Sequence, residues 1–366
     1  MKTSDFSYDL PPKLIAQTPA EPRDACRLLV LNRKTGLIEH TTFRSVLDYL
    51  DEGDVLVANK TRVLPARLFG IKIPTGARVE LLLTRQRFDL DVQGTIWECL
   101  VKPARRLKPD TQLAFGGAVA HAPQEESHET PLLEGEIIDY VLDVKGARLV
   151  RLTPQNGLTL QDALTQIGQL PLPPYIKDYT GDPELYQTVY AMEEQRSAAA
   201  PTAGLHFTGE LLHKAERRGI HLAFVELEVG IDTFRIVDEE DPRDHVMHTE
   251  RYHVSQETCD VIQAAKARGN RIVAVGTTSV RTLESAYSPK AHQVFPQESA
   301  TTDLFLLPGS KFYVVDAMIT NFHVPRSTLM MLVSAFATRE LIMHAYQEAI
   351  EHKYRMLSFG DAMLIL

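Results

Sequence analysis

Hydrophobic and polar residues alternate along this chain in two different ways. Between residues 69 and 148, short runs rich in Val, Ile, Leu and aromatic residues are separated by Gly, Pro and charged turns, which is typical of antiparallel hairpins. The expected strands are 79–83, 95–101, 112–117 and 136–144. Because no helical period interrupts them, this segment is predicted to be a small β-barrel.

From about residue 149 onward the pattern alternates between helices and strands. Thr208, Ser255 and Ser327 each precede an apolar helical repeat and are expected to cap a helix, the second of them ending at Gly269. Strands are expected at 271–276 and 312–319, the first followed by a loop at 277–285 that enters a helix. A further helix is expected at 339–353. Such units predict an α/β layer with ligands at the carboxyl ends of its strands.

The predicted fold class is therefore α/β, with a smaller antiparallel β-barrel domain inserted in a larger α/β domain. The α/β catalytic domain would comprise 1–68 and 149–366, and the barrel 69–148. A length of 366 residues, of which 44% are hydrophobic, suits two globular domains.

Cysteine usage and hydropathy predict a cytoplasmic protein. The chain has 3 cysteines, too few for a disulfide framework, so we expect free thiols in a reducing compartment. Its most apolar stretch, 329–337, is far shorter than the ~20 residues that a membrane span needs.

Charge is unevenly distributed. The whole chain carries −9, but residues 60–108 hold eleven Lys and Arg against four acidic residues, whereas 125–143 holds only acidic charges. A local basic face of this kind could bind phosphates. The alternative is a solvated surface that is simply basic.

Several enzyme classes lose support because their motifs are absent. The sequence contains no G-x-G-x-x-G after a strand, no G-x-x-x-x-G-K-[ST], no G-x-S-x-G and no C-x-x-C. Dinucleotide oxidoreductases, P-loop NTPases, α/β-hydrolases and zinc ribbons are therefore disfavoured. The usual Gly-rich methyltransferase loop is missing too.

The segment 198–212 is the first candidate site. Pro201 and Gly204 bracket a stretch that is too irregular for a helix, and His206 lies just before the helix capped by Thr208. A histidine there could serve as general acid or base beside an anion held by the helix N-terminus. A histidine bonded within a turn is the alternative.

Two strand ends supply further polar groups. The segment 277–281 offers hydroxyls and Arg281 for a carboxylate, ribose or phosphate, unless it is a plain N-cap with a surface arginine. In the segment 320–323, Asn321 could bind a purine edge and His323 could transfer a proton, while Phe322 could stack on a base or pack in the core.

Two further groups of residues have open interpretations. Asp361 follows Gly360, so its carboxylate could reach a ligand or cap a turn. His245, His248 and Glu250 could hold a metal with an open position, line a polar site or form structural hydrogen bonds.

Ten sequence blocks in this order closely resemble the S-adenosylmethionine:tRNA ribosyltransferase-isomerase family of queuosine biosynthesis. They span nearly the whole chain: DFSYDLPPKLIAQ (5–17), RLLVL (27–31), NKTRVLPARLFG (59–70), LPLPPYI (170–176), ELYQTVYA (184–191), APTAGLHFT (200–208), HVMHTE (245–250), VAVGTTSVRTLES (273–285), VVDAMITNFHVPRSTLMMLVSAFA (314–337) and YRMLSFGDAML (354–364).

The resemblance implies an enzyme that uses S-adenosylmethionine as a ribosyl donor. It would transfer and isomerise the ribosyl group onto 7-aminomethyl-7-deazaguanine at the wobble position of tRNA, giving epoxyqueuosine-tRNA, adenine and methionine. We expect a monomer that needs no metal. The implied catalytic candidates are His206, His323 and Asp361. The implied donor-binding candidates are Thr202, Gly204, Thr277, Thr278, Ser279, Arg281 and Asn321. Those for tRNA binding are Arg62, Arg67, Lys102, Arg105 and Arg106.

Several positions depart from the family pattern, including Thr338, which stands where the helix ending in Ala337 usually has a glycine. Arg196, Asp232 and Ala300 stand where glycine is usual, and Glu228 stands where histidine is usual. These changes alter charge and backbone freedom. Two alternatives therefore stay open: a catalytically altered paralogue that binds tRNA, and a metal-dependent hydrolase that uses His245, His248 and Glu250.

Overall fold

The computed structural model describes residues 1–366 apart from 117–129, 143, 145, 178, 231–232 and 234. The chain forms two compact units, Met1–Arg62 with Pro173–Leu366 and, separately, Val63–Leu172. The expected insertion, 69–148, lies within the second unit.

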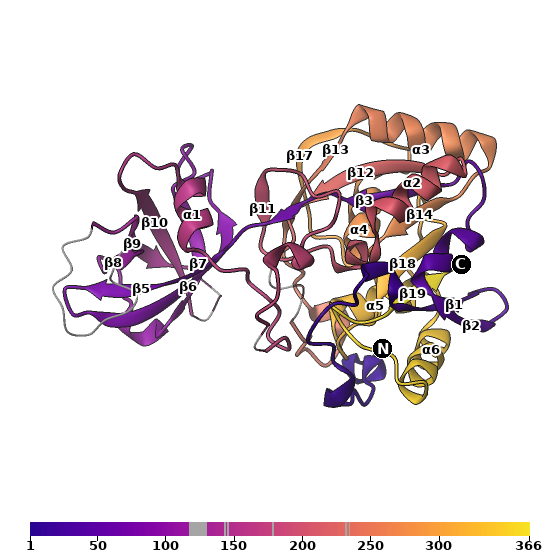
Figure 1. Cartoon of the computed structure of the whole chain (residues 1–366), viewed down its shortest axis with the longest axis horizontal. Helices are drawn as coiled ribbons and strands as arrows, with labels where there is room; N and C mark the ends of the chain where they lie inside the picture. The colour runs from indigo at the N-terminus through magenta and orange to yellow at the C-terminus, as the bar shows by residue number, and fades with distance from the viewer. Residues whose placement is uncertain (117–129, 143, 145, 178, 231–232, 234) are drawn as a thin grey trace. The chain divides into compact units, whose positions relative to one another are not determined.

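A nine-stranded mixed sheet organises the first unit (Figure 1). In spatial order its strands are β17 (Gln297–Thr302), β13 (Glu250–Val254), β12 (His221–Leu227), β3 (Val55–Asn59), β14 (Ile272–Val275), β18 (Ala317–Asn321), β19 (Ala362–Ile365), β1 (Arg27–Leu31) and β2 (Ile38–Thr42). The neighbours β12, β3, β14 and β18 run parallel. Their carboxyl ends therefore meet at one edge of the sheet.

Both faces of the central strands of this sheet are buried. Val55 and Val57 of β3 pack in one hydrophobic core, and Leu56 and Ala58 pack in another. Burial on both faces explains why β3, β14 and β18 are continuous apolar runs. The first core also takes the apolar residues of α3 (Gln256–Arg268), α4 (Thr277–Ala286), α5 (Thr328–Phe336) and α6 (Arg339–Glu351). The second takes those of α2 (Gly209–Arg217).

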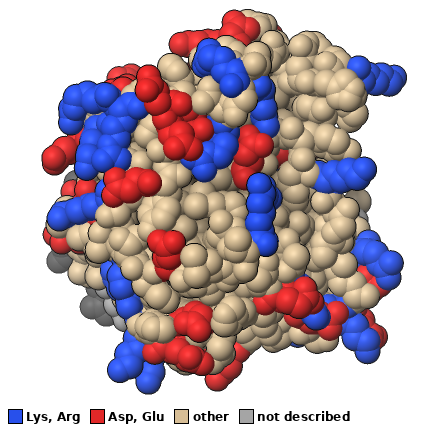
Figure 2. Space-filling model, turned by 90° about the vertical axis from the view of Figure 1, so that its right-hand side faces the viewer, with Lys and Arg blue, Asp and Glu red and all other residues tan. Residues whose placement is uncertain are grey.

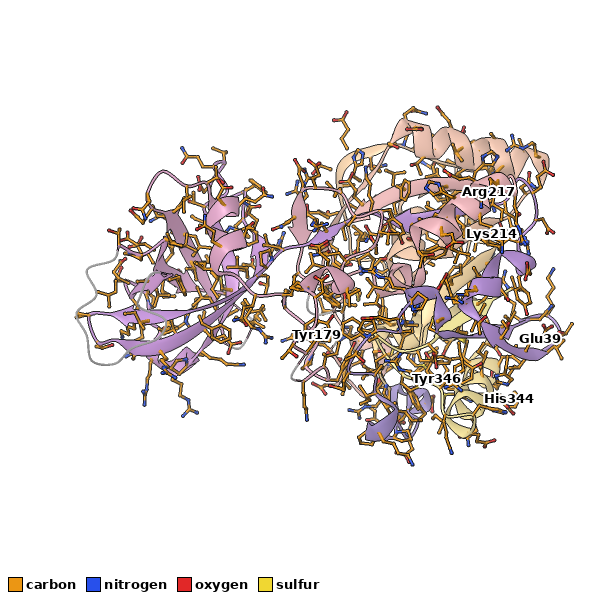
Figure 3. All side chains as sticks on the ribbon, viewed as in Figure 1. Glu39, Tyr179, Lys214, Arg217, His344 and Tyr346 are labelled. Atoms are coloured by element: carbon orange, nitrogen blue, oxygen red, sulfur yellow. The ribbon has the colours of Figure 1, made fainter. Side chains whose placement is uncertain are left out.

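The predicted helix caps are confirmed. The hydroxyls of Thr208, Ser255 and Ser327 accept hydrogen bonds from backbone N–H groups three residues further on, at 3.1–3.2 Å. Gly269 ends α3 in the left-handed conformation, with φ of 81°. Lys214 and Arg217, labelled in Figure 3, lie in the last turn of α2, where cations interact favourably with the helix dipole.

Two local expectations were wrong. The strand expected at 312–319 is β18, Ala317–Asn321, because the Glu284 carboxylate takes the N–H groups of residues 313–315 away from any strand ladder. No loop precedes α4, because Gly276, with φ of 87°, turns the chain directly from β14 into the helix.

The second unit is a closed six-stranded antiparallel barrel. In order around the barrel its strands are β10 (Ala147–Pro154), β7 (Ile96–Lys102), β6 (Ala77–Gln86), β5 (Arg67–Ile73), β8 (Gln112–Phe115) and β9 (Leu133–Tyr140). Alternate residues of β6 are buried, and Ala163 and Leu164 of α1 (Leu160–Ile167) join the same core. The predicted fold class is thus confirmed. Gly117, at the end of one expected strand, lies outside the described residues.

Four short strands complete the described chain: β4 (Arg62–Val63), β11 (Gln195–Ser197), β15 (Tyr287–Ser288) and β16 (Gln293–Val294). Among the described residues, no helix has both the length and the hydropathy needed to cross a membrane.

Candidate active site

A pocket with an empty volume of about 380 Å³ opens at the carboxyl ends of β14 and β18. Its lining comprises Ala200, Pro201, Thr202, Ala203, Val229, Thr233, Gly276, Thr277, Thr278, Thr320, Asn321, His323 and Leu329. Residues from the expected segments 198–212, 277–281 and 320–323 therefore meet in one place, as expected for polar groups that follow parallel strands.

The start of α4 contributes hydroxyls to the pocket. Thr277 and Thr278 line it, and Thr278 Oγ1 is buried with no hydrogen-bond partner among the described residues. Ser279 is different, because its hydroxyl donates to the Val275 carbonyl at 2.8 Å and points into the fold. The Thr278 hydroxyl, unlike that of Ser279, therefore keeps its hydrogen-bonding capacity for a ligand.

Asn321, at the end of β18, presents an oriented amide. Its Nδ2 donates to the carbonyl oxygens of Leu357, at 3.1 Å, and Ser358, at 3.4 Å. These acceptors fix which end of the amide is nitrogen. Asn321 Oδ1 is consequently an acceptor, and it is buried with no hydrogen bond of ordinary geometry in the described chain.

His206 lies behind the pocket wall. It ends a 3-10 helix, Thr202–His206, where an irregular stretch had been expected. Its Nδ1 lies 3.3 Å from Cys26 Sγ, and its buried Nε2 lacks a well-formed bond. Burial lowers the pKa of His206 to about 4, an effect opposed by Asn321 and aided by Arg355, so the ring is neutral near pH 7.

His323 lines the pocket itself. Its Nε2 lies 2.9 Å from Thr320 Oγ1, and its backbone N–H donates to the hydroxyl of Tyr346 on α6, labelled in Figure 3. Burial lowers the pKa of His323 to about 3. His323 is thus a second neutral imidazole, and its low pKa makes it a weak base.

The structure does not bring Asp361 to the pocket lining. One carboxylate oxygen accepts the Arg27 backbone N–H at 2.9 Å, and the other accepts Arg27 Nε at 3.2 Å and the Arg355 N–H at 2.7 Å. Gly204 has a packing role, since a Cβ there would lie 2.1 Å from the Tyr190 hydroxyl. Among the donor-binding candidates from its segment, only Thr202 reaches the lining.

Arg281 and Glu250 form a buried ion pair beside the pocket. Arg281 Nε donates to the Leu304 carbonyl at 3.2 Å, and Nη2 is buried without a partner in the described chain. Burial opposes ionisation of Glu250, but Arg281, His248 and the Gly230 N–H outweigh it, so the pKa of Glu250 is lowered. Glu250 Oε1 also accepts hydrogen bonds from the Gly230 N–H, at 2.9 Å, and from the hydroxyl of the pocket residue Thr233, at 3.4 Å.

The proposed metal ligands do not converge. His248 Nε2 lies 3.1 Å from Glu250, but His245 Nδ1 lies 3.0 Å from Glu239. Because Arg281 already neutralises Glu250, this carboxylate is a poor cation ligand. The hydrolase alternative thus has no ligand set in the described structure.

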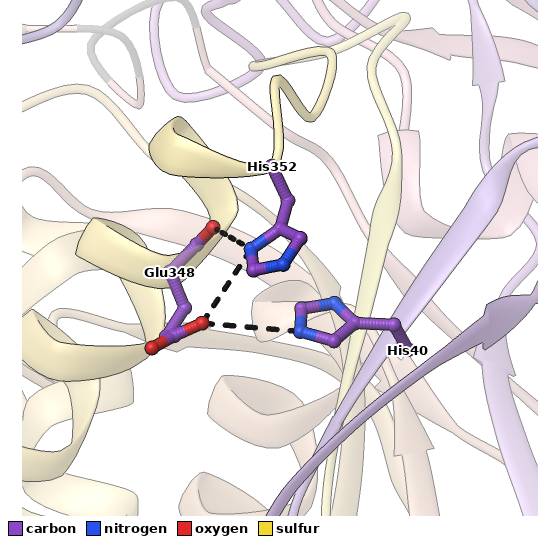
Figure 4. A group of neighbouring side chains, drawn as sticks. All are labelled: His40, Glu348 and His352. Carbon is purple, nitrogen blue, oxygen red and sulfur yellow. Dashed lines mark hydrogen bonds and ion pairs between the residues drawn. The ribbon is translucent and has the colours of Figure 1, made fainter.

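A different group of possible metal ligands lies on the surface: His40 of β2, Glu348 of α6 and His352 just beyond it (Figure 4). The two rings lie nearly face to face, with centroids 4.4 Å apart and 30° between their planes. Each nitrogen lone pair lies in its own ring plane, so the two do not point at one ion. His40 Nδ1 is bonded to Tyr354, and His352 Nδ1 to the Glu348 carbonyl.

The expected tRNA-binding residues have different surroundings. Arg62 pairs with Glu184, and in the barrel unit Arg67 and Lys102 both pair with Glu80. Arg105 and Arg106 are exposed on a short turn and have no ion pair among the described residues. Figure 2 shows the right-hand side of the Figure 1 view, where the α/β unit is drawn, and on that face basic and acidic side chains are interspersed rather than gathered in a continuous basic field.

A buried arginine supports that turn. Arg148 of β10 donates to the carbonyl oxygens of Leu107, Ala147 and Ala104, at 2.6–2.8 Å. All three guanidinium nitrogens of Arg148 thus bind backbone carbonyl oxygens. Arg105 and Arg106, on the turn itself, are exposed outside the barrel core.

The departures from the family pattern lie mainly at the surface or along strands. Arg196 pairs with Glu194 and Glu226, and Ala300 is opposite Tyr252 in the β17–β13 ladder. The Glu228 N–H donates to the Arg251 carbonyl at 2.9 Å. Asp232 lies outside the described residues. None of these four side chains is part of the described pocket lining.

Several site residues escaped prediction. Val229 and Leu329 form apolar walls that resemble any core residue, and Cys26 contacts His206 across 180 positions of sequence. Thr320 belongs to the candidate segment 320–323, but the sequence does not single it out as a site residue. The proximity of Glu250 to Arg281 had no signal in the spacing of either residue.

Comparisons with known proteins identify the family of the whole chain. A family model described as "Queuosine biosynthesis protein" matches residues 3–365. Proteins of Staphylococcus epidermidis and Staphylococcus aureus, both named S-adenosylmethionine:tRNA ribosyltransferase-isomerase, are 48% identical over the full length of both chains. A crystal structure of S-adenosylmethionine tRNA ribosyltransferase from Thermotoga maritima is 38% identical, with a TM-score of 0.52, over 99% of this chain and 100% of that one. The chain therefore belongs to the S-adenosylmethionine:tRNA ribosyltransferase-isomerase family of queuosine biosynthesis.

Proposed function

We propose that this enzyme transfers the ribosyl group of S-adenosylmethionine to 7-aminomethyl-7-deazaguanine at the tRNA wobble position and isomerises it. The products would be epoxyqueuosine-tRNA, adenine and methionine. Family membership supports the reaction class. The observation that carries the proposal for this chain is the pair of unsatisfied polar atoms at the pocket, Thr278 Oγ1 and Asn321 Oδ1.

A polar ligand bound in the pocket would supply the hydrogen-bond partners that these two atoms lack. A buried polar group without a partner costs about 1–3 kcal/mol. Asn321 Oδ1 would accept from the amino group of the adenine ring, and Thr278 would bond the ribose or the adenine. The second polar end of the donor, its methionine carboxylate, would meet the unpaired Nη2 of Arg281.

The proton chemistry needs a group that can accept and then return a proton. The sulfonium acidifies the neighbouring C5′ hydrogens, and the departing adenine must gain a proton. His323 lines the pocket, so it is the best-placed acceptor. Its low pKa makes it a weak base and favours passing the same proton on to adenine. His206 does not line the pocket, so it would support the reaction indirectly. Asp361 would act indirectly, by holding Arg27 and the Arg355 backbone.

The tRNA would be held through its phosphates, and Arg105 and Arg106 are the side chains freest to do so. Lys102, Arg67 and Arg62 would have to exchange their carboxylate partners for phosphate. We propose a cytoplasmic monomer.

The direct experiment mixes the protein with S-adenosylmethionine and tRNA that carries the aminomethyl-deazaguanine base. Adenine release coupled to a gain in tRNA mass equal to the ribosyl group would support the proposal. Salt-sensitive tRNA binding with no adenine release would overturn it in favour of the non-catalytic paralogue.

A matched pair of variants links the reaction to the pocket. Thr278→Val removes a hydroxyl that has no partner in the described chain, so stability should not fall while the KM for S-adenosylmethionine rises about tenfold. Thr282→Val, one turn further along α4, removes a bond to the Thr278 carbonyl instead. It should lower stability by about 1 kcal/mol and leave KM unchanged. Equal KM values in both variants would remove Thr278 from the donor site.

A further inference from the structure

We propose that Cys26 is a positioning residue. Its thiol donates a hydrogen bond to His206 Nδ1, which fixes the imidazole as the Nε2–H tautomer and directs that N–H at Asn321 Oδ1 in the pocket wall. The link to catalysis rests on the proposed function, whereas the tautomer does not.

The geometry of the pair is that of a buried hydrogen bond. Cys26 Sγ and His206 Nδ1 are 3.3 Å apart, and the two residues are 3% and 4% exposed. Cys26 directly precedes β1, and His206 ends the 3-10 helix before α2. The Phe43 ring packs against the imidazole, with centroids 5.2 Å apart. The ring is therefore enclosed and cannot exchange Cys26 for water.

The Asn321 amide indicates which ring nitrogen carries the proton. Its Nδ2 is committed to the carbonyls of Leu357 and Ser358, so the atom facing His206 is Oδ1, which can only accept. A favourable contact therefore requires a hydrogen on Nε2. Nδ1 of the neutral ring then holds a lone pair, and the Cys26 thiol is the donor that lies beside it.

The charged alternative, a thiolate beside an imidazolium, is disfavoured on both sides. Burial raises the pKa of the Cys26 thiol, and Asp361 and Asp24 add to this, against a smaller opposing effect of Arg355. Burial and Arg355 both lower the pKa of His206. The pair is thus a neutral thiol and a neutral imidazole.

The consequence is a directed chain of polar contacts. The Cys26 thiol donates to His206, the His206 N–H is directed at Asn321 Oδ1 without a hydrogen bond of ordinary geometry, and Asn321 Nδ2 donates to the two carbonyls. A carbonyl oxygen has two lone pairs, so Oδ1 keeps one for a ligand in the pocket. Within this chain His206 orients Asn321 and is not the base. Proton acceptance falls to His323.

The test reads the tautomer directly by ¹⁵N NMR of the His206 ring. The wild type and Cys26→Ser, whose hydroxyl also donates, should show Nε2–H. Cys26→Ala should lose this preference and titrate nearer the ordinary histidine range. Cys259→Ala, which shortens another buried free thiol, is the control and should leave the His206 signals unchanged. If Cys26→Ala does not fold, Cys26→Val retains the volume without the donor.

Kinetics then test the catalytic link. Cys26→Ala should raise the KM for S-adenosylmethionine about tenfold and add an inflection on the acid side of the pH profile of adenine release, while Cys26→Ser behaves as wild type. An Nδ1–H tautomer in the wild type, or an unchanged tautomer in Cys26→Ala, would overturn the inference. A wild type with the Nε2–H tautomer but no adenine release would instead overturn the proposed function.

Discussion

The two units place their decisive polar groups in opposite environments. In the α/β unit, Glu250, Arg281 and Asn321 are buried within or beside the pocket. In the barrel unit, Arg105 and Arg106 are exposed. A buried polar group acts through specific hydrogen-bond or ion-pair partners, and removing its partner lowers stability strongly. A surface charge acts mainly through its contribution to the electrostatic potential around the protein. Substitutions should therefore have large, local effects in the first unit and small, salt-dependent effects in the second.

The largest expected difference is in the free energy of unfolding lost when one of two glutamates, Glu250 or Glu80, is replaced. Glu250→Ala would leave the Arg281 guanidinium buried without its carboxylate and should cost about 3–5 kcal/mol of unfolding free energy. Glu80→Ala in the barrel removes partly exposed ion pairs and should cost less than about 1 kcal/mol. Urea unfolding followed by far-UV circular dichroism measures both.

The fluorescence of Trp97 sharpens this test. Trp97 is the single tryptophan of the chain and packs in the barrel core. Glu250→Ala should shift the dichroism transition and leave the Trp97 transition in place. A Trp97 transition that moves by the same amount would show that the two units unfold together.

Acid should weaken the α/β unit selectively. The pKa values of His206 and His323 are lowered in the folded protein, to about 4 and about 3. Below pH 6.5 these two histidines therefore become protonated in the unfolded chain while they stay neutral in the folded chain. Their contribution to stability is full above pH 6.5 and is lost as the pH falls towards these folded values. Between pH 7 and pH 5 each should cost about 2 kcal/mol.

The described part of the barrel contains no buried histidine, so its Trp97 transition should depend less on pH over this range. His323→Gln is the control and should flatten the pH dependence of the dichroism transition. An unchanged slope in this variant would mean that His323 is not the group responsible.

The smallest expected effect belongs to the surface charges. Replacing Arg105 and Arg106 by Ala should weaken tRNA binding several-fold and reduce the slope of log Kd against log salt by about 2. Arg151→Ala is the matched control, because Arg151 is already paired with Glu136 at 2.8 Å. Binding isotherms at three salt concentrations would show whether Arg105 and Arg106 contact phosphate.

The sequence predicted those features that depend on local patterns. Ser255, Ser327 and Thr208 cap helices as expected, and strand-end segments converge because parallel strands share an edge. Patterns could not show that the Asp361 carboxylate is occupied by Arg27, since these residues are far apart in the chain. Nor could they place Cys26 beside His206, because a small apolar-looking residue before a strand has no distinctive periodicity.

The Arg148 guanidinium has a consequence for the dynamics of recognition. By binding the Leu107, Ala147 and Ala104 carbonyls it fixes the backbone of the basic turn, so the turn would be ordered before the RNA arrives if it contacts RNA as proposed. The conformational entropy of that turn is then lost during folding rather than at the moment of encounter. A turn that is ordered in advance should associate with RNA faster, and with less dependence on temperature, than a flexible arginine-rich loop of equal charge.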